Sequence, residues 1–148
     1  MKMTVSLICV GRLKEKYFAD ACAEYVKRLS AFCKLNIIQL DETALEEEGR
    51  RIFAAVPPGY PLVALCVEGE RTSSEGLAEL LRSVEVSGKS GICFALGGSN
   101  GLADEVKRRA DTRISMSDMT FPHHLARVML LEQVYRGFTI LRGGKYHK

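Results

Sequence analysis

Glycines dominate the stretch whose residues best suit ligand binding, Gly97-Gly98-Ser99-Asn100-Gly101. The uncharged run at residues 92–96 predicts a buried strand before it, and residues 102–110, with acids first and bases last, predict a helix after it. Backbone N–H groups in such a turn can approach a ligand closely because no Cβ intervenes. The turn matches neither common nucleotide-binding glycine fingerprint, so a tight turn without a ligand is the alternative.

A second stretch, residues 116–121, combines two methionines and a phenylalanine with small polar residues just before Pro122. Proline suits the first turn of a helix and favours extended backbone before it, so we expect an irregular loop leading into a helix. These side chains could clasp a flat ligand such as adenine, although plugs of the core are the alternative. His123 and His124 suit caps or surface positions better than metal binding, because neither has a partner at i+4.

The third stretch, residues 142–148, holds three cations, a phenol and an imidazole after a Gly143-Gly144 hinge, and it contains no acid. Terminal segments are usually disordered. These groups nevertheless suit phosphate contact, base stacking and proton removal, so the segment is a candidate for contact with RNA.

Strands and helices that alternate along the chain must position these stretches. Uncharged or β-branched runs predict strands at residues 4–10, 35–40, 62–67, 92–96 and 112–116. Helical patterns lie at residues 14–32, 43–56, 73–84, 103–110 and 125–141. We therefore expect an α/β fold with a mostly parallel sheet and helices on both faces.

Helix boundaries and one helix face carry further expectations. Thr43-x-x-Glu46 and Thr72-x-x-Glu75 predict capping boxes. The last helix is apolar nearly all round, so it must be covered on more than one side. We expect it to form a dimer interface, with Leu131 and Val134 as candidate contacts.

Length, charge and cysteine usage narrow the class of protein. The 148 residues suit one domain, and a net charge of +3 permits RNA binding without requiring it. Five cysteines, odd in number and without a C-x-x-C pair, predict buried thiols in a reducing cytoplasm and no zinc site. No apolar run approaches the roughly 18 residues of a membrane span, so we expect a soluble cytoplasmic protein with no membrane contact.

Four separated motifs together resemble the ribosomal RNA large subunit methyltransferase H family, a minimal member of the SPOUT α/β-knot methyltransferases. They are Gly97-Gly98-Ser99-Asn100-Gly101, Met119-Thr120-Phe121-Pro122-His123, Glu132-Gln133-Val134-Tyr135-Arg136 and Tyr146-His147-Lys148. The resemblance runs from residue 10 to residue 148. It implies one trefoil-knotted domain without a separate RNA-binding domain. It also implies a homodimer that transfers a methyl group from S-adenosylmethionine to N3 of a pseudouridine in large-subunit (23S) ribosomal RNA.

The same resemblance implies roles for individual residues. Donor binding falls to Leu65, Gly97, Met116, Ser117, Asp118, Met119, Thr120 and Phe121. Roles in the tail follow instead from side-chain chemistry: His147 is a candidate base or orienting group, and Tyr146 a stacking or hydrogen-bonding partner. A His147 that only contacts RNA is the alternative. Phosphate contacts fall to Arg142, Lys145 and Lys148. Such a transfer requires alignment of two molecules and loss of a proton, but no metal and no covalent nucleophile.

Two other classes of protein stay open from the sequence. A dinucleotide-binding oxidoreductase could use the same architecture, but residues 10–14 lack the glycine fingerprint expected after its first strand. A non-catalytic RNA-binding protein would account for the tail but not for the loop at residues 116–121. Whether the RNA substrate is free ribosomal RNA or an assembled ribosome also stays open.

Overall fold

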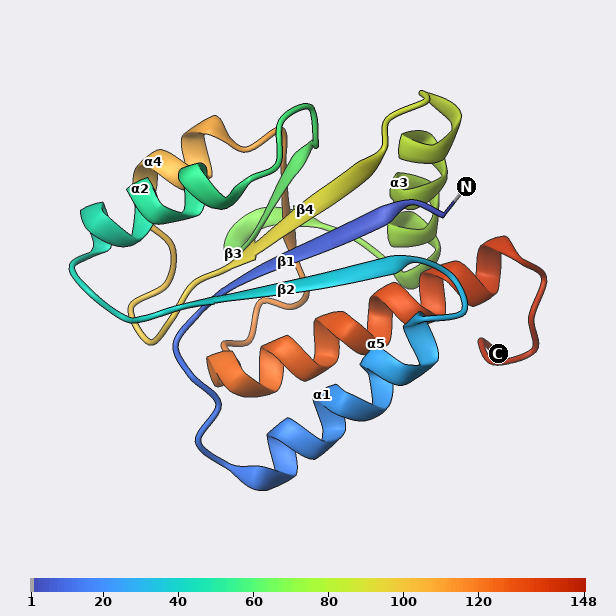
Figure 1. Cartoon of the computed structure of the whole chain (residues 1–148), viewed down its shortest axis with the longest axis horizontal. Helices are drawn as coiled ribbons and strands as arrows, with labels where there is room; N and C mark the ends of the chain where they lie inside the picture. The colour runs from blue at the N-terminus through green and yellow to red at the C-terminus, as the bar shows by residue number, and fades with distance from the viewer. Residues whose placement is uncertain (1) are drawn as a thin grey trace.

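The computed structural model describes residues 2–148, in which five parallel strands form one sheet in the order β2-β1-β4-β3-β5 (Figure 1). The strands are β1 (Thr4–Val10), β2 (Lys34–Leu40), β3 (Leu62–Arg71), β4 (Gly91–Leu96) and β5 (Thr112–Ser115). The helices are α1 (Lys16–Leu29), α2 (Leu45–Ala55), α3 (Ser74–Val86), α4 (Asp104–Arg109) and α5 (His123–Leu141). The predicted α/β fold with a parallel sheet is confirmed.

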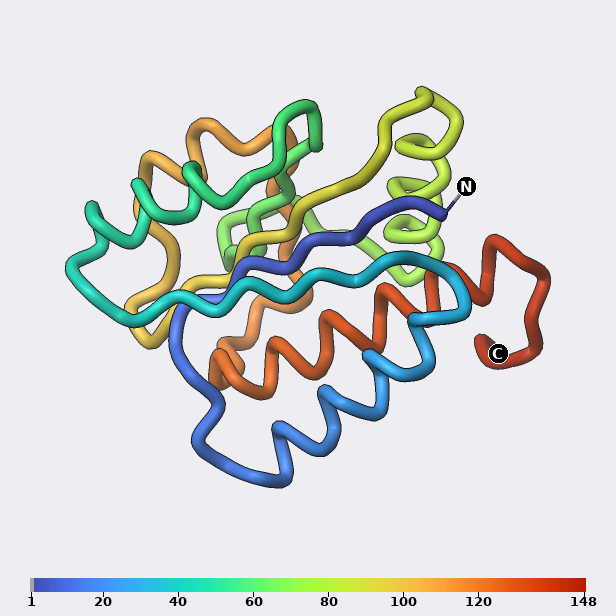
Figure 2. The backbone as a smooth tube through the Cα atoms, viewed as in Figure 1, coloured from blue at the N-terminus to red at the C-terminus, as the bar shows by residue number. Residues whose placement is uncertain are grey.

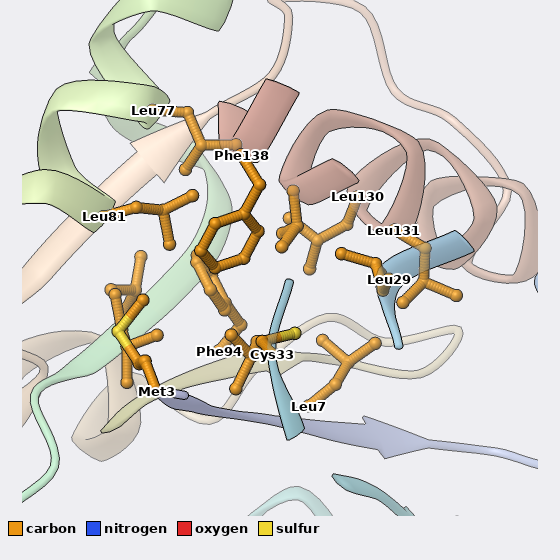
Figure 3. Packing of buried hydrophobic residues seen from close by; sticks show 14 of the residues in the cluster. Met3, Leu7, Leu29, Cys33, Leu77, Leu81, Phe94, Leu130, Leu131 and Phe138 are labelled. Carbon is orange, nitrogen blue, oxygen red and sulfur yellow. The ribbon is translucent and has the colours of Figure 1, made fainter. Parts of the chain in front are cut away.

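The two faces of the sheet bury separate hydrophobic clusters. Along β4, Ile92, Phe94 and Leu96 point into the cluster formed with α1, α3 and α5, part of which Figure 3 shows. Cys93 and Ala95, the alternate residues, point into the cluster under α2 and α4. Successive side chains of a strand face opposite sides, so β4 is covered on both faces, which explains its uncharged sequence.

Strand β3 is longer than its sequence suggests. The sequence predicted its end at residue 67, but the strand continues to Arg71 and pairs again with β5 after a register shift. A Cβ at Gly69 would lie 2.6 Å from the backbone of Ile114. The glycine therefore allows two strands to approach closely, and the predicted strand end at residue 67 was wrong.

Both predicted capping boxes are also wrong in detail. Helix α2 begins at Leu45, and the carboxylate of Glu48, not Glu46, accepts a hydrogen bond from the Thr43 backbone N–H at 2.8 Å. In α3 the capping residue is Ser73, whose hydroxyl accepts from the Gly76 N–H at 2.9 Å. Neighbouring residues of similar type compete for the capping position, and local geometry decides between them.

Helix α5 packs between α1 and α3 on one face of the sheet. Leu131 and Val134 are 1% and 2% exposed within the chain, so they belong to the core and cannot be the partner contacts that were expected. Leu125, Met129 and Ile140 are half-buried and share another face of the helix by their spacing. That face is the part of α5 that remains accessible to a partner.

Candidate functional site

A cavity of about 590 Å³ opens where the carboxyl ends of β3, β4 and β5 meet. Its walls come from the far half of β3, the glycine turn after β4, and the loop between β5 and α5. Figure 2 shows how these segments, which are distant in sequence, converge at one edge of the sheet. The volume falls within the range of about 300–1,000 Å³ that is usual for small-molecule sites.

Seven of the eight residues predicted to bind the donor line this cavity. They are Leu65, Gly97, Met116, Ser117, Met119, Thr120 and Phe121. Asp118 does not line it, because its carboxylate turns away to pair with Arg71, with 3.1 Å between Arg71 Nε and Asp118 Oδ1. The sequence placed Asp118 correctly in the loop, but only the backbone conformation decides where its side chain points.

The glycine turn is held together by close contact between its own two ends. A Cβ at Gly97 would lie 2.6 Å from the Leu102 nitrogen and closer still to the Gly101 carbonyl. The Gly101 N–H donates to the Gly98 carbonyl at 3.0 Å, which closes the turn. Glycine is therefore needed at position 97 for the turn to exist, and not only to leave room for a ligand.

Glu42 supports this turn from outside the predicted site. Its carboxylate oxygen Oε1 accepts hydrogen bonds from the Ser99 backbone N–H at 2.7 Å and from the Ser99 hydroxyl at 2.9 Å. These two hydrogen bonds, the backbone one first, hold the pKa of Glu42 below its usual value. Nothing in the local sequence pairs residues 42 and 99, so sequence reasoning missed this contact.

The loop before α5 is ordered by its own serines. The Ser115 hydroxyl donates to the Ser117 carbonyl at 2.9 Å, and the Ser117 hydroxyl accepts from the Met119 N–H at 3.0 Å. Side chains of Met116 and Phe121 line the cavity, while Met119 stands 72% exposed at its edge. The loop therefore offers apolar surface together with backbone polar groups, as the sequence suggested.

The extension of β3 contributes cavity residues that the sequence did not predict. Cys66, Val67 and Glu68 line one side, and Lys107 of α4 donates to the Glu68 carboxylate at 2.7 Å. Burial raises the pKa of the Cys66 thiol, which keeps it protonated and unreactive. Only Glu68 lies beyond the strand end predicted at residue 67, whereas Cys66 and Val67 lie within the predicted strand and carry no pattern that marks a site.

His123 also lines the cavity, at the first turn of α5. Burial, followed by the neighbouring His124, lowers the pKa of His123. A Cβ on Gly11 would lie 3.2 Å from its Nε2 atom, so the ring packs against the end of β1. His123 was expected to be a cap or a surface residue, and this was wrong because the loop turns it inward.

Behind His123 lies Arg127, a buried cation that sequence reasoning missed. The side chain is 3% exposed and donates to the Gly11 carbonyl and to the Gln39 side-chain oxygen, each at 2.8 Å. These bonds fasten the start of α5 to the ends of β1 and β2. Its position in an apolar helix was the available signal, because an arginine there needs buried acceptors.

The tail, residues 142–148, is ordered and lies away from the cavity of its own chain. It turns back along α5 (Figure 1), where the Tyr146 hydroxyl donates to Glu132 at 2.7 Å. The Arg136 guanidinium lies 3.1 Å from His147 Nδ1. Arg142 pairs with Glu85 at 2.9 Å, whereas Lys145 and Lys148 are exposed. The structure thus groups Tyr146 with His147 but does not bring them to the predicted donor residues.

The tail, as folded, lies at the far end of α5 from the loop that lines the cavity. The 19 residues of α5 lie between the two, and the helix is about 28 Å long at about 1.5 Å per residue. His147 follows Leu141 by six residues, which reach about 22 Å when fully extended. A tail that acts at a donor site is therefore better placed to act at the site of another chain.

Two kinds of feature are not found in the described part of the chain. Among residues 2–148, no cluster of three or more histidine, cysteine, aspartate or glutamate side chains could hold a metal ion. None of the helices in that range has the length and apolar character needed to cross a membrane.

Comparisons with known proteins agree with this geometry. A family model described as "Predicted SPOUT methyltransferase" matches residues 3–147. A ribosomal RNA large subunit methyltransferase H from Bacillus pumilus is 46% identical over 99% of this chain and all of its own length. The protein of that name from Pelotomaculum thermopropionicum is 45% identical over 97% of this chain and 98% of its own.

Comparison with solved structures supports the fold of this chain and nothing beyond the fold. A probable methyltransferase from Bordetella pertussis superposes with a TM-score of 0.60 at 11% identity, covering 92% of this chain and 96% of that one. A probable methylase family protein from Haemophilus influenzae gives 0.56 at 11% identity, over 99% and 70% of the two chains. The family model and the sequence relatives show that the chain belongs to the SPOUT methyltransferases and, among them, to the ribosomal RNA large subunit methyltransferase H family.

Proposed function

We propose that this protein is a cytoplasmic homodimer that transfers a methyl group from S-adenosylmethionine to N3 of a pseudouridine in large-subunit (23S) ribosomal RNA. The observation that carries the proposal is the cavity at the strand ends, where seven residues expected to bind the donor converge. Membership of a methyltransferase family favours this activity over an oxidoreductase or a non-catalytic RNA-binding protein. The trefoil knot of the SPOUT fold stays a prediction.

The residues of the cavity fit this donor. Leu65, Leu96, Met116 and Phe121 supply apolar walls for an adenine ring, and the turn and loop supply backbone groups for its edge. When bound, S-adenosylmethionine supplies a methyl group on a positively charged sulfur. The chain itself has to hold this group, exclude water from it and align the attacking nitrogen with it.

The tail supports the substrate half of the reaction. N3 of pseudouridine lies in an imide and carries a proton that must leave during transfer. Tyr146 and His147 are the polar side chains that the tail offers for this step, as donor, base or orienting group. Exposed Lys145 and Lys148 suit phosphate contacts, and Arg142 joins them if its pair with Glu85 opens.

A site shared between two chains explains the separation of tail and cavity. The half-buried face of α5 that carries Leu125, Met129 and Ile140 also carries Glu132 and Arg136, which hold the tail. Pairing of two chains through this face would bring the tail of one chain toward the cavity of the other. The domain at residues 2–148 would then grip RNA without a separate RNA-binding domain.

Mixed dimers test the shared site. Deleting residues 146–148 should leave the affinity for S-adenosylmethionine nearly intact and lower methyl transfer to ribosomal RNA by about a hundredfold or more. A second variant, Phe121→Glu, should lose donor binding but keep its tail. Equal mixing should restore about a quarter of wild-type activity, because half the dimers are mixed and each contains one complete site.

Each outcome of the mixing experiment is informative. No recovery in dimers verified as mixed would place each site within a single chain. Full activity of the deletion alone would remove the tail from the chemistry. Absence of methyl transfer by the wild-type protein, on both free ribosomal RNA and assembled ribosomes, would refute the proposed function itself.

A further inference from the structure

Four side chains clasp the tail against α5, and we call Glu132, Arg136, Tyr146 and His147 the tail clasp. Glu132 is at its centre, since it accepts from the Tyr146 hydroxyl and from the Arg136 guanidinium, both at 2.7 Å. Arg136 also lies 4.7 Å from the centroid of the Tyr146 ring. The clasp thus fixes both tail residues that the proposed function requires.

The contact between Arg136 and His147 determines where the imidazole carries its proton. Arg136 Nη1 lies 3.1 Å from His147 Nδ1. A guanidinium group has only donors, so Nδ1 must accept this hydrogen bond. A neutral imidazole has one donor and one acceptor, which places the proton of His147 on Nε2.

The surroundings of Nε2 agree with this assignment. The Glu75 carboxylate lies 3.6 Å from Nε2. A carboxylate attracts an N–H group and repels a bare nitrogen lone pair. Nε2 is therefore the outward-facing donor of the ring, and its side chain is 28% exposed and available to a substrate.

We propose that His147 takes part in methyl transfer as a hydrogen-bond donor through Nε2, and that Arg136 is the positioning residue that holds it in this form. This role rests on the transfer to N3 proposed above. Of the two roles considered for His147, base and orienting group, it selects the orienting group. A general base would need a free lone pair on the accessible nitrogen, and the clasp has occupied the only one.

The chemistry of the transfer gives such a donor a use. The N3 proton passes to water as the transfer begins, the electron pair left on N3 forms the new N–C bond, and the electron pair of the broken C–S bond returns to sulfur. Negative charge builds on the two carbonyl oxygens that flank N3 as that proton leaves. An N–H donor held against one of these oxygens stabilises the charge.

Tyr146 has a matching role in the clasp. Burial first, and then its hydrogen bond to Glu132, raises the pKa of the phenol above its usual value. The phenol therefore stays protonated and donates its hydrogen bond to Glu132. Tyr146 anchors the tail, and its ring packs edge-on against Tyr135 with centroids 4.8 Å apart.

Nitrogen-15 NMR of histidine-labelled protein tests the assignment without any activity measurement. The chain has three histidines, so the His147 signals are those lost in a His147→Gln variant. In its neutral form, we expect the wild-type ring to carry its proton on Nε2. Arg136→Met should release the ring into a mixture of both forms. A proton on Nδ1 in the wild-type dimer overturns the proposal.

Two amide variants test the role in catalysis. Glutamine places an N–H donor near the position of imidazole Nε2 but accepts no proton, whereas asparagine reaches only as far as Nδ1. We expect His147→Gln to keep methyl transfer within about tenfold of wild type, and His147→Asn to lose about a hundredfold. If the glutamine variant is no more active than the asparagine variant, His147 does not act as a donor. If wild type itself is inactive, the proposed function fails while the NMR result stands.

Discussion

Substitution of Gly97 by alanine tests whether the glycine turn holds the donor. A Cβ at this position would lie 2.6 Å from the Leu102 nitrogen, and ordinary van der Waals contact begins at 3.4 Å. The two ends of the turn must therefore separate by at least about 0.8 Å at the Leu102 nitrogen and by more at the Gly101 carbonyl, because these neighbours are backbone atoms that cannot rotate away. A misplacement of about 1 Å in a site costs about a hundredfold in rate.

We therefore expect Gly97→Ala to reduce methyl transfer about a hundredfold and to weaken binding of S-adenosylmethionine. Overpacking of this kind also costs about 1–3 kcal/mol of folding free energy. Calorimetric titration of the donor and thermal unfolding by circular dichroism measure these two effects separately on the same protein.

Gly101→Ala is the matched control in the same turn. A Cβ there meets no atom within 4 Å, but the residue has φ +76°, which strains alanine by about 1 kcal/mol. We expect this variant to lose stability while donor affinity changes by less than about fivefold. A folded Gly97→Ala protein with wild-type donor affinity and activity would show that the turn does not form the donor site.

Three further predictions use contacts outside the predicted site. Glu42→Ala should weaken donor binding about five- to thirtyfold, because two hydrogen bonds to an exposed carboxylate are worth about 1–2 kcal/mol together. Glu42→Gln keeps an accepting oxygen, so it should lose less affinity for S-adenosylmethionine in the same titration. Met129→Glu should convert the dimer to monomer in sedimentation, since an unpaired buried charge costs about 3–5 kcal/mol. Val86→Glu is the control and should leave the dimer intact, because the Val86 side chain is 72% exposed. A wild-type monomer at micromolar concentration would reject the interface. Because the pKa of His123 is lowered in the folded chain, the imidazole binds a proton more readily when the chain is unfolded. The free energy of unfolding should therefore fall as the pH drops below about 6.5. His123→Gln should flatten that decline in thermal unfolding, and an unchanged decline would assign it to other groups.

Much of the architecture follows from local sequence. Buried parallel strands require uncharged runs, and helices require periodic apolar positions, so the alternation of the two predicts the sheet and its covering helices. A glycine cluster after a buried strand, and a methionine-rich loop before a proline, each mark a site within a few residues. These signals placed the cavity at the correct edge of the sheet, because carboxyl ends of parallel strands share one edge.

Tertiary structure alone decided the contacts that hold the site together. Glu42 and Ser99 are 57 residues apart, and Arg127 and Gly11 are 116 apart, so no local pattern relates them. The same holds for Leu131 and Val134, whose apolar character suits a core and a dimer interface equally well until α1 and α3 cover them. Sequence patterns report which side chains seek burial or polar partners, and the folded chain determines which partners they meet.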